Sequence, residues 1–478
     1  MLFNSLGFLI FLPVVFALYW LVNKKSLQLQ NIILLVASYF FYACWDWRFL
    51  FLLLFSTALD YFTGIKMHDA QTQTAKKTWF WLSISINLGF LGVFKYYNFF
   101  AESFAEFLSQ FGFQANFWTL QVILPVGISF YTFHGLSYVI DIYKDRIKPE
   151  KNIVEYSLFV SYFPLLVAGP IERATHLLPQ IKVRRQFNKD KAIDGIHQIL
   201  WGLFKKVVIA DTCATYANYI FDHHETANSL TLVLGAVYFA FQIYGDFSGY
   251  SDIALGTSKL FGIDLLRNFN YPYFSRDIAE FWRRWHISLS TWFRDYLYVP
   301  LGGSRGGMWM KIRNTFIIFL VSGFWHGANW TFIAWGFLNA VYFLPLLVTN
   351  RNRNHIEIVA KGKSFPTVKE FFQMVITFVL STLAWIFFRS ESVGAAIQYI
   401  RRIFSFDFKG GVQYLGIDRY SVEILLLLLL FLFFEWHSRE GEHPFFGKYK
   451  HIKTFSILLC LLLFGVYSKA SDFIYFQF

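Results

Sequence analysis

The chain has 478 residues, of which 56% are hydrophobic and only 15% are charged, and its mean hydropathy is +0.41. Because a soluble domain carries about 25% charged residues, this composition excludes a soluble globular protein and indicates a polytopic membrane protein. The net charge of +12 comes from lysines and arginines that collect in short loops between apolar runs, as the positive-inside rule predicts. These loops favour anionic membrane lipids, and not nucleic acid, as a partner.

The N-terminal part of the chain consists of apolar runs long enough to cross a membrane as helices. The first run ends at Lys24 and Lys25, and a linker with three lysines, 66–77, precedes the fourth. If both basic stretches are cytoplasmic, the N-terminus faces outside and the first four spans alternate without conflict. Residues 97–112 are shorter and amphipathic, so we expect a helix in the outer interface. The spans predicted in this part are 5–22, 29–44, 48–65, 78–95 and 120–142.

The apolar run 153–171 lies between two basic loops, which argues against a simple crossing. We expect a re-entrant or in-plane piece that turns back at Pro164, Gly169 and Pro170. Irregular backbone at membrane depth needs protein or water around it, so this piece is expected to line a cavity.

The C-terminal part continues the helical pattern with residues 193–221 and 229–262. Roughly eleven crossings and several in-plane pieces result, since each crossing needs about 20 apolar residues. The predicted fold is therefore all-α, one membrane-embedded domain of residues 1–478 with its catalytic core at about 120–350. The remaining spans are predicted near 312–325, 329–348, 371–388, 422–436 and 454–468.

His326 is the strongest candidate for chemistry, because an ionisable side chain at membrane depth is costly and by default functional. It lies in GFWHGAN, where the small residues Gly323, Gly327 and Ala328 would let a substrate carbonyl approach the imidazole closely. The alternative is a histidine that only donates a hydrogen bond to a neighbouring helix.

His286, in RRWHISLSTW, is the second candidate. Imidazole titrates near neutrality, so it can accept a proton from a hydroxyl and return it. The alternative is an interfacial histidine on an amphipathic helix whose basic face carries Arg283 and Arg284. A third intramembrane histidine, His134 in FYTFHGLSY, is interpreted as a packing residue.

A metal site is not expected. His286 and His326 are far apart in sequence and have no third ligand at suitable spacing. The three cysteines, Cys44, Cys213 and Cys460, lack metal-ligand spacing and are interpreted as buried small apolar residues.

The glycine cluster 302–307 can present backbone N–H groups and the Arg305 guanidinium to a phosphate, although it matches no nucleotide-binding fingerprint. The alternative is a flexible loop. Asp246 and Asp252 are more consistent with structural pairing inside the bundle, and the neighbouring arginines with lipid-headgroup or structural partners. The weaker candidates for substrate binding are Arg283, Arg284, Arg294, Arg305, Asp246, Trp325 and Asn329.

Four stretches of the chain resemble the membrane-bound O-acyltransferase family, in the bacterial branch that contains the alginate O-acetyltransferase membrane subunit. The resemblance runs from the first span to the last, and the two histidine motifs are specific to the family. The stretches are LFNSLGFLIFLPVVFALYW, YGDFSGYSDIALG, FWRRWHISLSTWFRDYLYVPLGGSRGG and SGFWHGANWTFIAWG.

The resemblance implies a ring of tilted helices around a thin centre with a tunnel. It implies that His326 is the catalytic base and that His286 is the second family histidine. The implied donor is cytoplasmic acetyl-CoA, or an acyl-carrier protein, with no permanently bound cofactor. The acetyl group would cross the bacterial inner membrane to an alginate-like polysaccharide or to peptidoglycan.

The resemblance also implies an extracytoplasmic partner, a separate Ser-His-Asp acyltransferase of the SGNH/GDSL type, because this chain carries no such nucleophile motif. Two alternatives stay open at this point. One is D-alanyl transfer from a carrier protein to teichoic acid, and the other is a non-enzymatic transporter of lipid or solute.

Overall fold

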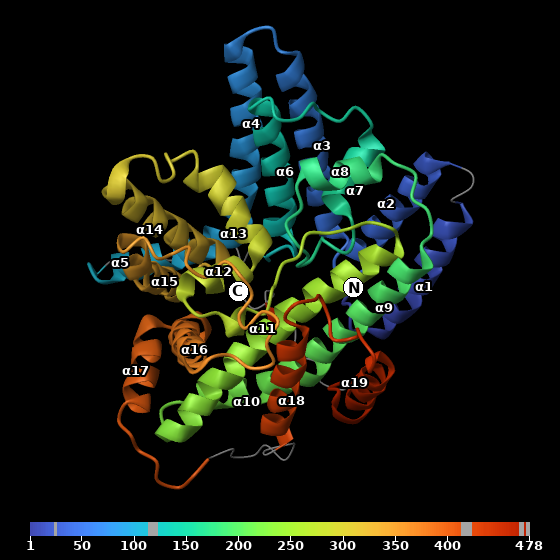
Figure 1. Cartoon of the computed structure of the whole chain (residues 1–478). Coiled ribbons are helices and arrows are strands. Elements are labelled where there is room, and N and C mark those ends of the chain that lie inside the picture. Colours follow the sequence, from blue (N-terminus) through green and yellow to red (C-terminus); the bar gives the residue numbers. More distant parts are fainter. Residues whose placement is uncertain (23–25, 113–122, 413–422, 468–472, 475–478) are drawn as a thin grey trace. The chain divides into compact units, whose positions relative to one another are not determined.

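The computed structural model describes residues 1–22, 26–112, 123–412, 423–467 and 473–474. These residues are helical with connecting loops, and no β-strand occurs among them, so the predicted all-α fold is confirmed (Figure 1). The chain forms two compact units. Unit 1 comprises Met1–Gly195 with Thr257–Leu266, and unit 2 comprises Ile196–Gly256 with Arg267–Phe478. The prediction of one domain with a core at about 120–350 stays a prediction.

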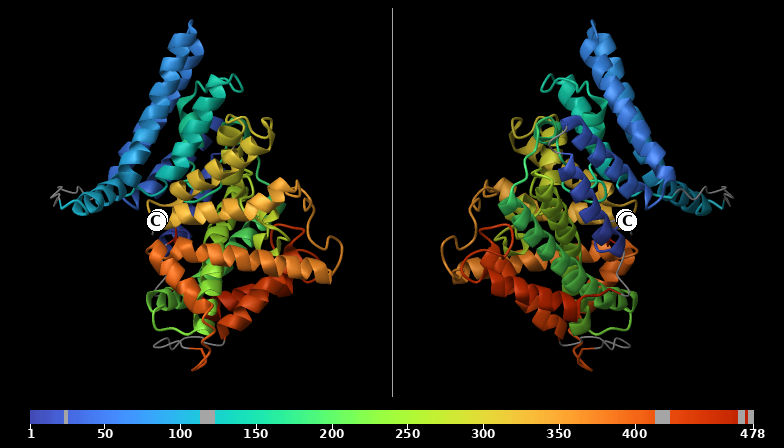
Figure 2. Two further views of the ribbon diagram at one scale, coloured as in Figure 1. Left: turned by 90° about the vertical axis from the view of Figure 1, so that its left-hand side faces the viewer. Right: turned by 90° about the vertical axis from the view of Figure 1, so that its right-hand side faces the viewer.

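Unit 1 is built around a hairpin of α3 and α4, against which α6 packs (Figures 1 and 2). The buried Asp60 carboxylate of α3 accepts hydrogen bonds from Ser83 and Asn87 of α4, at 2.6 and 2.7 Å. These two hydrogen bonds satisfy the Asp60 side chain inside an otherwise apolar bundle. The elements of unit 1 are α1 (Leu6–Leu21), α2 (Leu27–Ala43), α3 (Arg48–Asp69), α4 (Gln73–Leu91), a π-helical turn (Gly92–Tyr96), α5 (Tyr97–Ser109), α6 (Ile128–Tyr143), α7 (Ile153–Ser161) and α8 (Ala174–Ile181).

The predicted re-entrant segment is an interrupted helix. The helix α7 has nine residues, too few to cross a membrane, and 162–168 continue as buried turns. Phe163 donates its backbone N–H to Ser38 Oγ at 3.0 Å, which satisfies one freed backbone group. The irregular backbone is therefore as predicted, and the expectation that it lines a cavity stays a prediction, since the segment does not line the cavity described below. Protein side chains enclose this segment instead.

Unit 2 contains both candidate histidines and most of the longest described helix, α11 (Ser229–Leu260). Two unit boundaries fall within α9 (Lys189–Leu203) and α11, and the third lies in the loop between Leu266 and Arg267. The other elements are a π-helical segment (Phe204–Ala210), α10 (Asp211–Asp222), a 3-10 turn (Pro272–Phe274), α12 (Ile278–Arg284), α13 (Ile287–Phe293), a π-helical turn (Arg294–Tyr298), α14 (Gly307–His326), α15 (Trp330–Val348), α16 (Val368–Arg389), α17 (Val393–Ile403), α18 (Glu423–Ser438) and α19 (Lys450–Phe464).

Within the described ranges, four helices are long and apolar enough to cross a membrane: α3, α11, α15 and α16. The shorter apolar helices include α1 and α2. The chain is thus a multi-pass membrane protein, while the count of about eleven crossings stays a prediction that rests on span length. The helix α5 has no buried residue, and its interfacial placement also stays a prediction.

Two details complete the comparison with the predicted elements. Cys44 is exposed at the end of α2, so its expected burial is wrong, whereas Cys213 and Cys460 are buried. The basic stretch at Lys24 and Lys25, where the first predicted span ends, lies outside the described residues, as do positions 120–122, 422 and 468 of three predicted spans.

Candidate active site

His286 lies in a sharp turn between two seven-residue helices, α12 and α13. The Asp277 side chain begins α12 by accepting the Glu280 N–H at 2.7 Å, and the helix stops at Trp285, whose backbone is extended. His286 itself has φ = 44°, a left-handed conformation that is uncommon for a non-glycine residue. Such strain persists only where the surroundings impose it, and it concentrates at functional sites.

Asn268 fixes the position of this turn. Its side-chain oxygen lies 3.1 Å from His286 Nδ1, and it accepts hydrogen bonds from the hydroxyl and the backbone N–H of Ser288, at 2.9 and 3.3 Å. The imidazole of His286 is 1% exposed, and its Nε2 has no hydrogen-bond partner in the part of the chain that the structure describes. Burial lowers the pKa of His286, which lies outside the candidate membrane spans, to about 3. The ring is therefore neutral at physiological pH.

His326 is the last residue of α14, and the packing of α14 on α15 sets its position. A Cβ atom on Gly323 would lie 2.3 Å from the Phe332 carbonyl oxygen, and one on Gly336 would lie 2.3 Å from the Phe319 carbonyl oxygen. Only glycine allows this close approach of two helices. The expectation that Gly323 leaves room for a substrate carbonyl is therefore wrong, because α15 occupies that room.

The side chain of His326 is enclosed by aromatic rings on one side. Its ring centre lies 5.1 Å from that of Trp335 on α15 and 5.4 Å from that of Phe388 on α16. A Cβ on Gly327 would meet the Phe332 ring, so this glycine also serves packing. The aromatic wall limits the directions from which a substrate can reach the imidazole.

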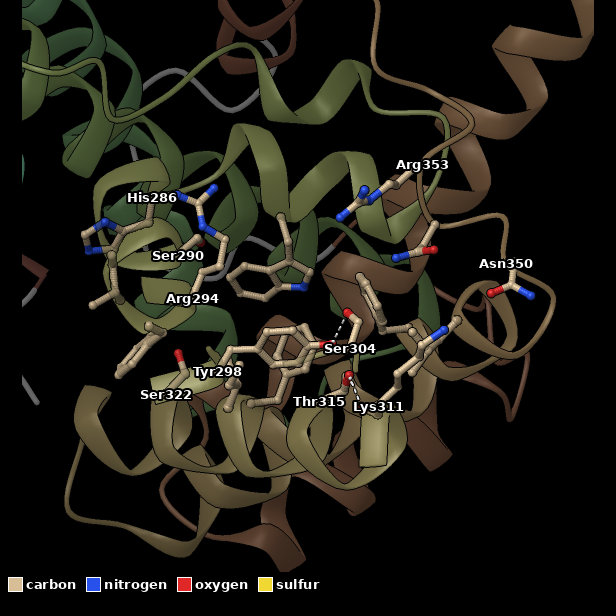
Figure 3. A pocket seen from close by; sticks show the side chains of 18 of the residues that line it. His286, Ser290, Arg294, Tyr298, Ser304, Lys311, Thr315, Ser322, Asn350 and Arg353 are labelled. Atoms are coloured by element: carbon tan, nitrogen blue, oxygen red, sulfur yellow. Dashed lines mark hydrogen bonds between the residues drawn. The ribbon is translucent and has the colours of Figure 1, made fainter. Parts of the chain in front are cut away.

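The two histidines lie side by side, with ring centres 6.5 Å apart, and both line one cavity of about 520 Å³. This volume is in the range of small-molecule sites, about 300–1,000 Å³. The wall near the histidines is mostly apolar, and it includes two hydroxyl groups, those of Ser290 and Ser322. The other side chains of this part are Trp282, Leu289, Phe293, Ile318 and Phe319, whereas Thr315 lies beside Lys311 (Figure 3).

The other end of the cavity is polar and positively charged. Figure 3 shows Lys311, Asn350 and Arg353 together at the end away from His286. Lys311 lies fifteen residues before His326 on the same helix, which corresponds to roughly 22 Å along the axis at 1.5 Å per residue. The cavity therefore suits an elongated ligand with an anionic end and a reactive group at the other end.

The arginines near His286 have different environments. Arg294 lines the cavity and pairs with Asp295 at 2.7 Å. Arg283 donates to the backbone carbonyls of Asn352 and His355, at 2.7 and 2.8 Å, and its neighbour Arg284 pairs with Glu280 at 2.8 Å. Arg283 and Arg284 thus hold protein segments together.

Arg305 is exposed and lies outside the cavity wall, whereas its neighbour Ser304 lines the cavity and contacts the Tyr298 hydroxyl at 3.0 Å. Asn314 holds the glycine-rich loop by donating to the Gly303 carbonyl at 3.0 Å. Phosphate contact by this loop stays a prediction.

The aspartates of the YGDFSGYSDIALG motif are paired with lysines. Lys206 lies 2.8 Å from Asp246 and 2.9 Å from Asp211, and Lys205 pairs with Asp252. Asp246 lines no part of the cavity described above.

Two further candidates, Trp325 and Asn329, lie outside the cavity wall, as does His134, which was interpreted as a packing residue. Trp325 packs its ring against His326, with ring centres 4.8 Å apart. Asn329 begins α15 by accepting the Thr331 N–H at 3.0 Å. His134, in unit 1, is buried and accepts the Glu172 backbone N–H at 3.1 Å. In the described ranges no group of three His, Cys, Asp or Glu side chains is arranged to hold a metal ion.

Sequence reasoning missed Asn268. The available signal was its place in RNFNYPY, a polar stretch between the YGDFSGYSDIALG motif and the first histidine motif. No periodicity marks such a loop residue, and the contact with His286 exists only once the chain is folded.

The chain is similar in sequence to known membrane proteins. Residues 144–387, which include both histidines and Asn268, match the model of the membrane-bound O-acyltransferase family. The chain is 41% identical to the probable alginate O-acetylase AlgI of Pseudomonas aeruginosa, over 85% of this chain and 75% of that protein. It is 33% identical to the peptidoglycan O-acetyltransferase of Helicobacter pylori, over 100% of this chain and 98% of that protein. It is also 30% identical to the teichoic acid D-alanyltransferase of Bacillus subtilis, over 45% of this chain and 57% of that protein.

Proposed function

The chain belongs to the membrane-bound O-acyltransferase family, and we propose that it transfers an acetyl group from cytoplasmic acetyl-CoA toward an extracytoplasmic polysaccharide. An acyltransferase activity agrees with the relatives that are named O-acetylases and O-acetyltransferases. The same relatives argue against the alternative of a non-enzymatic transporter.

The observation that carries the proposal is the cavity that joins two imidazoles to a cationic end. Acetyl-CoA is elongated, with phosphates at one end and a thioester at the other. Lys311 and Arg353 suit the phosphates by charge, and the apolar wall beside the histidines suits the acetyl thioester. Because lysine and arginine favour the cytoplasmic side, the cationic end is assigned to that side.

In the proposed reaction His326 is the general base. The imidazole removes the proton of the acceptor hydroxyl as its oxygen attacks the thioester carbonyl carbon. A carbon–oxygen bond forms, the carbon–sulfur bond breaks, and the proton passes to the leaving thiolate to give free CoA. His286 orients the reacting groups from the same cavity. Positioning both reactants away from water supplies much of the acceleration, since effective molarities can reach ~10⁵ M.

The acceptor is proposed to be an alginate-like exopolysaccharide or peptidoglycan, after the names of the relatives. A separate extracytoplasmic serine acyltransferase would complete the transfer. The protein would then reside in the bacterial inner membrane.

A second candidate is D-alanyl transfer from a carrier protein, which the match to a teichoic acid D-alanyltransferase favours. That match covers 45% of this chain, whereas the matches to the alginate relatives cover 85%, so acetyl transfer is preferred. Ester analysis of the cell envelope separates the two candidates, because alkaline hydrolysis releases acetate in one case and D-alanine in the other.

The test in cells is complementation of a deletion strain with the wild-type gene, with His326→Ala and with His223→Ala. His223 is an exposed histidine at the end of α10 and serves as the matched control. We expect O-acetyl esters to return with wild type and His223→Ala but not with His326→Ala, at equal amounts of membrane-inserted protein. Esters restored by His326→Ala would refute the assignment.

A further inference from the structure

We propose that Asn268 is a positioning residue that holds His286 with its hydrogen on Nδ1, so that Nε2 carries no hydrogen and can only accept a hydrogen bond. The inference rests on the proposed acyl transfer and refines one part of it. In this tautomer Nε2 has no hydrogen to donate, so His286 does not polarise the thioester carbonyl, and the single hydrogen of the attacking hydroxyl goes to His326.

The first step is the identity of the Asn268 atom that faces His286. The backbone N–H of Ser288 points at this atom from 3.3 Å, and a backbone N–H can only donate. The atom is therefore the side-chain oxygen, whichever way the amide is drawn. An amide oxygen can only accept, so His286 Nδ1, at 3.1 Å, carries the hydrogen.

The second step concerns the support of Asn268 itself. Its backbone carbonyl accepts the Ile287 N–H at 2.9 Å, and its side-chain nitrogen donates to Ser251 Oγ on α11 at 3.3 Å. Two residues further on, Asn270 donates its N–H to the Arg284 carbonyl at 2.9 Å. The segment that carries Asn268 thus binds the chain on both sides of His286 and supports its left-handed backbone.

The third step concerns the ring of His286. Phe247 packs edge to face against it, with ring centres 4.6 Å apart, and Trp325 and Phe269 lie at 6.0 and 6.3 Å. These contacts pack the ring on several sides. With Nδ1 bound to Asn268 and the ring neutral, Nε2 carries a lone pair and no hydrogen, and it is buried without a hydrogen-bond partner among the described residues. The other titratable groups on the cavity wall are His326, Arg294, Tyr298, Lys311 and Arg353.

The test uses the full-length protein in proteoliposomes with acetyl-CoA, and it compares wild type with Asn268→Asp and Asn268→Leu. The Asp variant keeps an oxygen acceptor of the same size but places a negative charge beside Nδ1–H, which stabilises the imidazolium form of His286. Once protonated, Nε2 cannot accept. We therefore expect the acidic limb of the kcat profile to move upward by at least about one pH unit.

The Leu variant keeps the volume but removes the acceptor, so neither tautomer of His286 is preferred. We expect kcat to fall about 100-fold while KM for acetyl-CoA stays within about twofold, as for loss of an oriented base. Asn228→Asp is the matched control, because Asn228 is a buried asparagine of the same unit that lies outside the cavity wall. Its pH profile should equal that of wild type.

A wild-type pH profile in Asn268→Asp, or an unchanged kcat in Asn268→Leu, would overturn the inference. If the Leu variant does not fold, the profile of the Asp variant decides alone. A different result, undiminished activity of His326→Ala, would contradict the proposed function. The two failures are therefore distinguishable.

Discussion

Two sets of buried polar groups in unit 2 differ in how they are satisfied. Around α11, Lys206 pairs with Asp246 and Asp211, and Lys205 pairs with Asp252. At the cavity, His286 Nε2 is buried and has no hydrogen-bond partner among the described residues.

The difference separates structural from reactive groups. A buried charge that is paired contributes to a unique fold, and removing its partner is costly. A buried polar atom left without a partner is unusual and calls for an explanation, such as a ligand or a catalytic role. The comparison predicts that changes in the lysine–aspartate cluster reduce stability, whereas changes at the histidines reduce activity.

The largest loss of stability is expected for Lys206→Met. The substitution leaves two carboxylates buried without their cation, which costs about 3–5 kcal/mol. The thermal unfolding midpoint in detergent should fall by many degrees, and the protein that remains folded should keep its turnover number. In the triple variant with Lys206→Met, Asp246→Asn and Asp211→Asn, part of the lost thermal stability should be recovered, because no buried carboxylate is then left without its cation. An unchanged thermal midpoint in Lys206→Met would contradict the structural role of the lysine–aspartate cluster.

A smaller loss is expected for Gly323→Ala. The new methyl group would lie 2.3 Å from the Phe332 carbonyl oxygen, so α14 and α15 must move apart, at a cost of about 1–3 kcal/mol. Because His326 ends α14, activity should fall as well. Gly89→Ala is the control, since its methyl group meets nothing within 4 Å. Equal thermal midpoints for the two variants would show that the close helix contact is unimportant.

Removing the positive charges at the cationic end of the cavity is expected to weaken donor binding moderately. Lys311→Ala with Arg353→Ala should raise KM for acetyl-CoA about tenfold with little change in kcat, because charge-assisted hydrogen bonds to phosphate are lost. Acetyl-pantetheine lacks the nucleotide phosphates, and its KM should be the same for the variant and wild type. An equal rise in KM for both donors would contradict the assignment of this end to phosphate.

The smallest effect concerns a pair in unit 1, the partly exposed His176 and the buried Glu172. The hydrogen bond from His176 Nδ1 to Glu172, at 2.7 Å, raises the pKa of His176 above its usual value. A raised folded-state pKa stabilises the protein below about pH 6.5, and the contribution is lost as the pH rises through the folded pKa. The thermal midpoint should therefore fall slightly between about pH 6 and pH 8 in wild type, and less in His176→Gln.

Much of the fold follows from the sequence because apolar run length sets helix length in a membrane. The predicted span 329–348 matches α15, Trp330–Val348, closely. The helix α14 begins at Gly307, earlier than the predicted 312, because Lys311 and Arg313 in its first turns lower the local hydropathy.

The candidate site was predictable only in part. The tryptophan-flanked histidine motifs indicated His286 and His326, and the fold brings them to one cavity. A structural role was among those expected for Arg283, but its partners were not predictable, because they are backbone carbonyls about 70 residues away, which carry no sequence signal. Asn268 was missed for a similar reason, since only the folded loop brings its amide to the imidazole.

The central claim is that the imidazole at position 326 catalyses acyl transfer inside this cavity. The most direct measurement is the release of free CoA from acetyl-CoA by purified protein in proteoliposomes, with wild type, His326→Ala and His223→Ala compared at equal folded amounts. The account predicts that His326→Ala loses about a thousandfold in rate while its thermal midpoint and that of the control stay unchanged. CoA release by His326→Ala at the wild-type rate would contradict it.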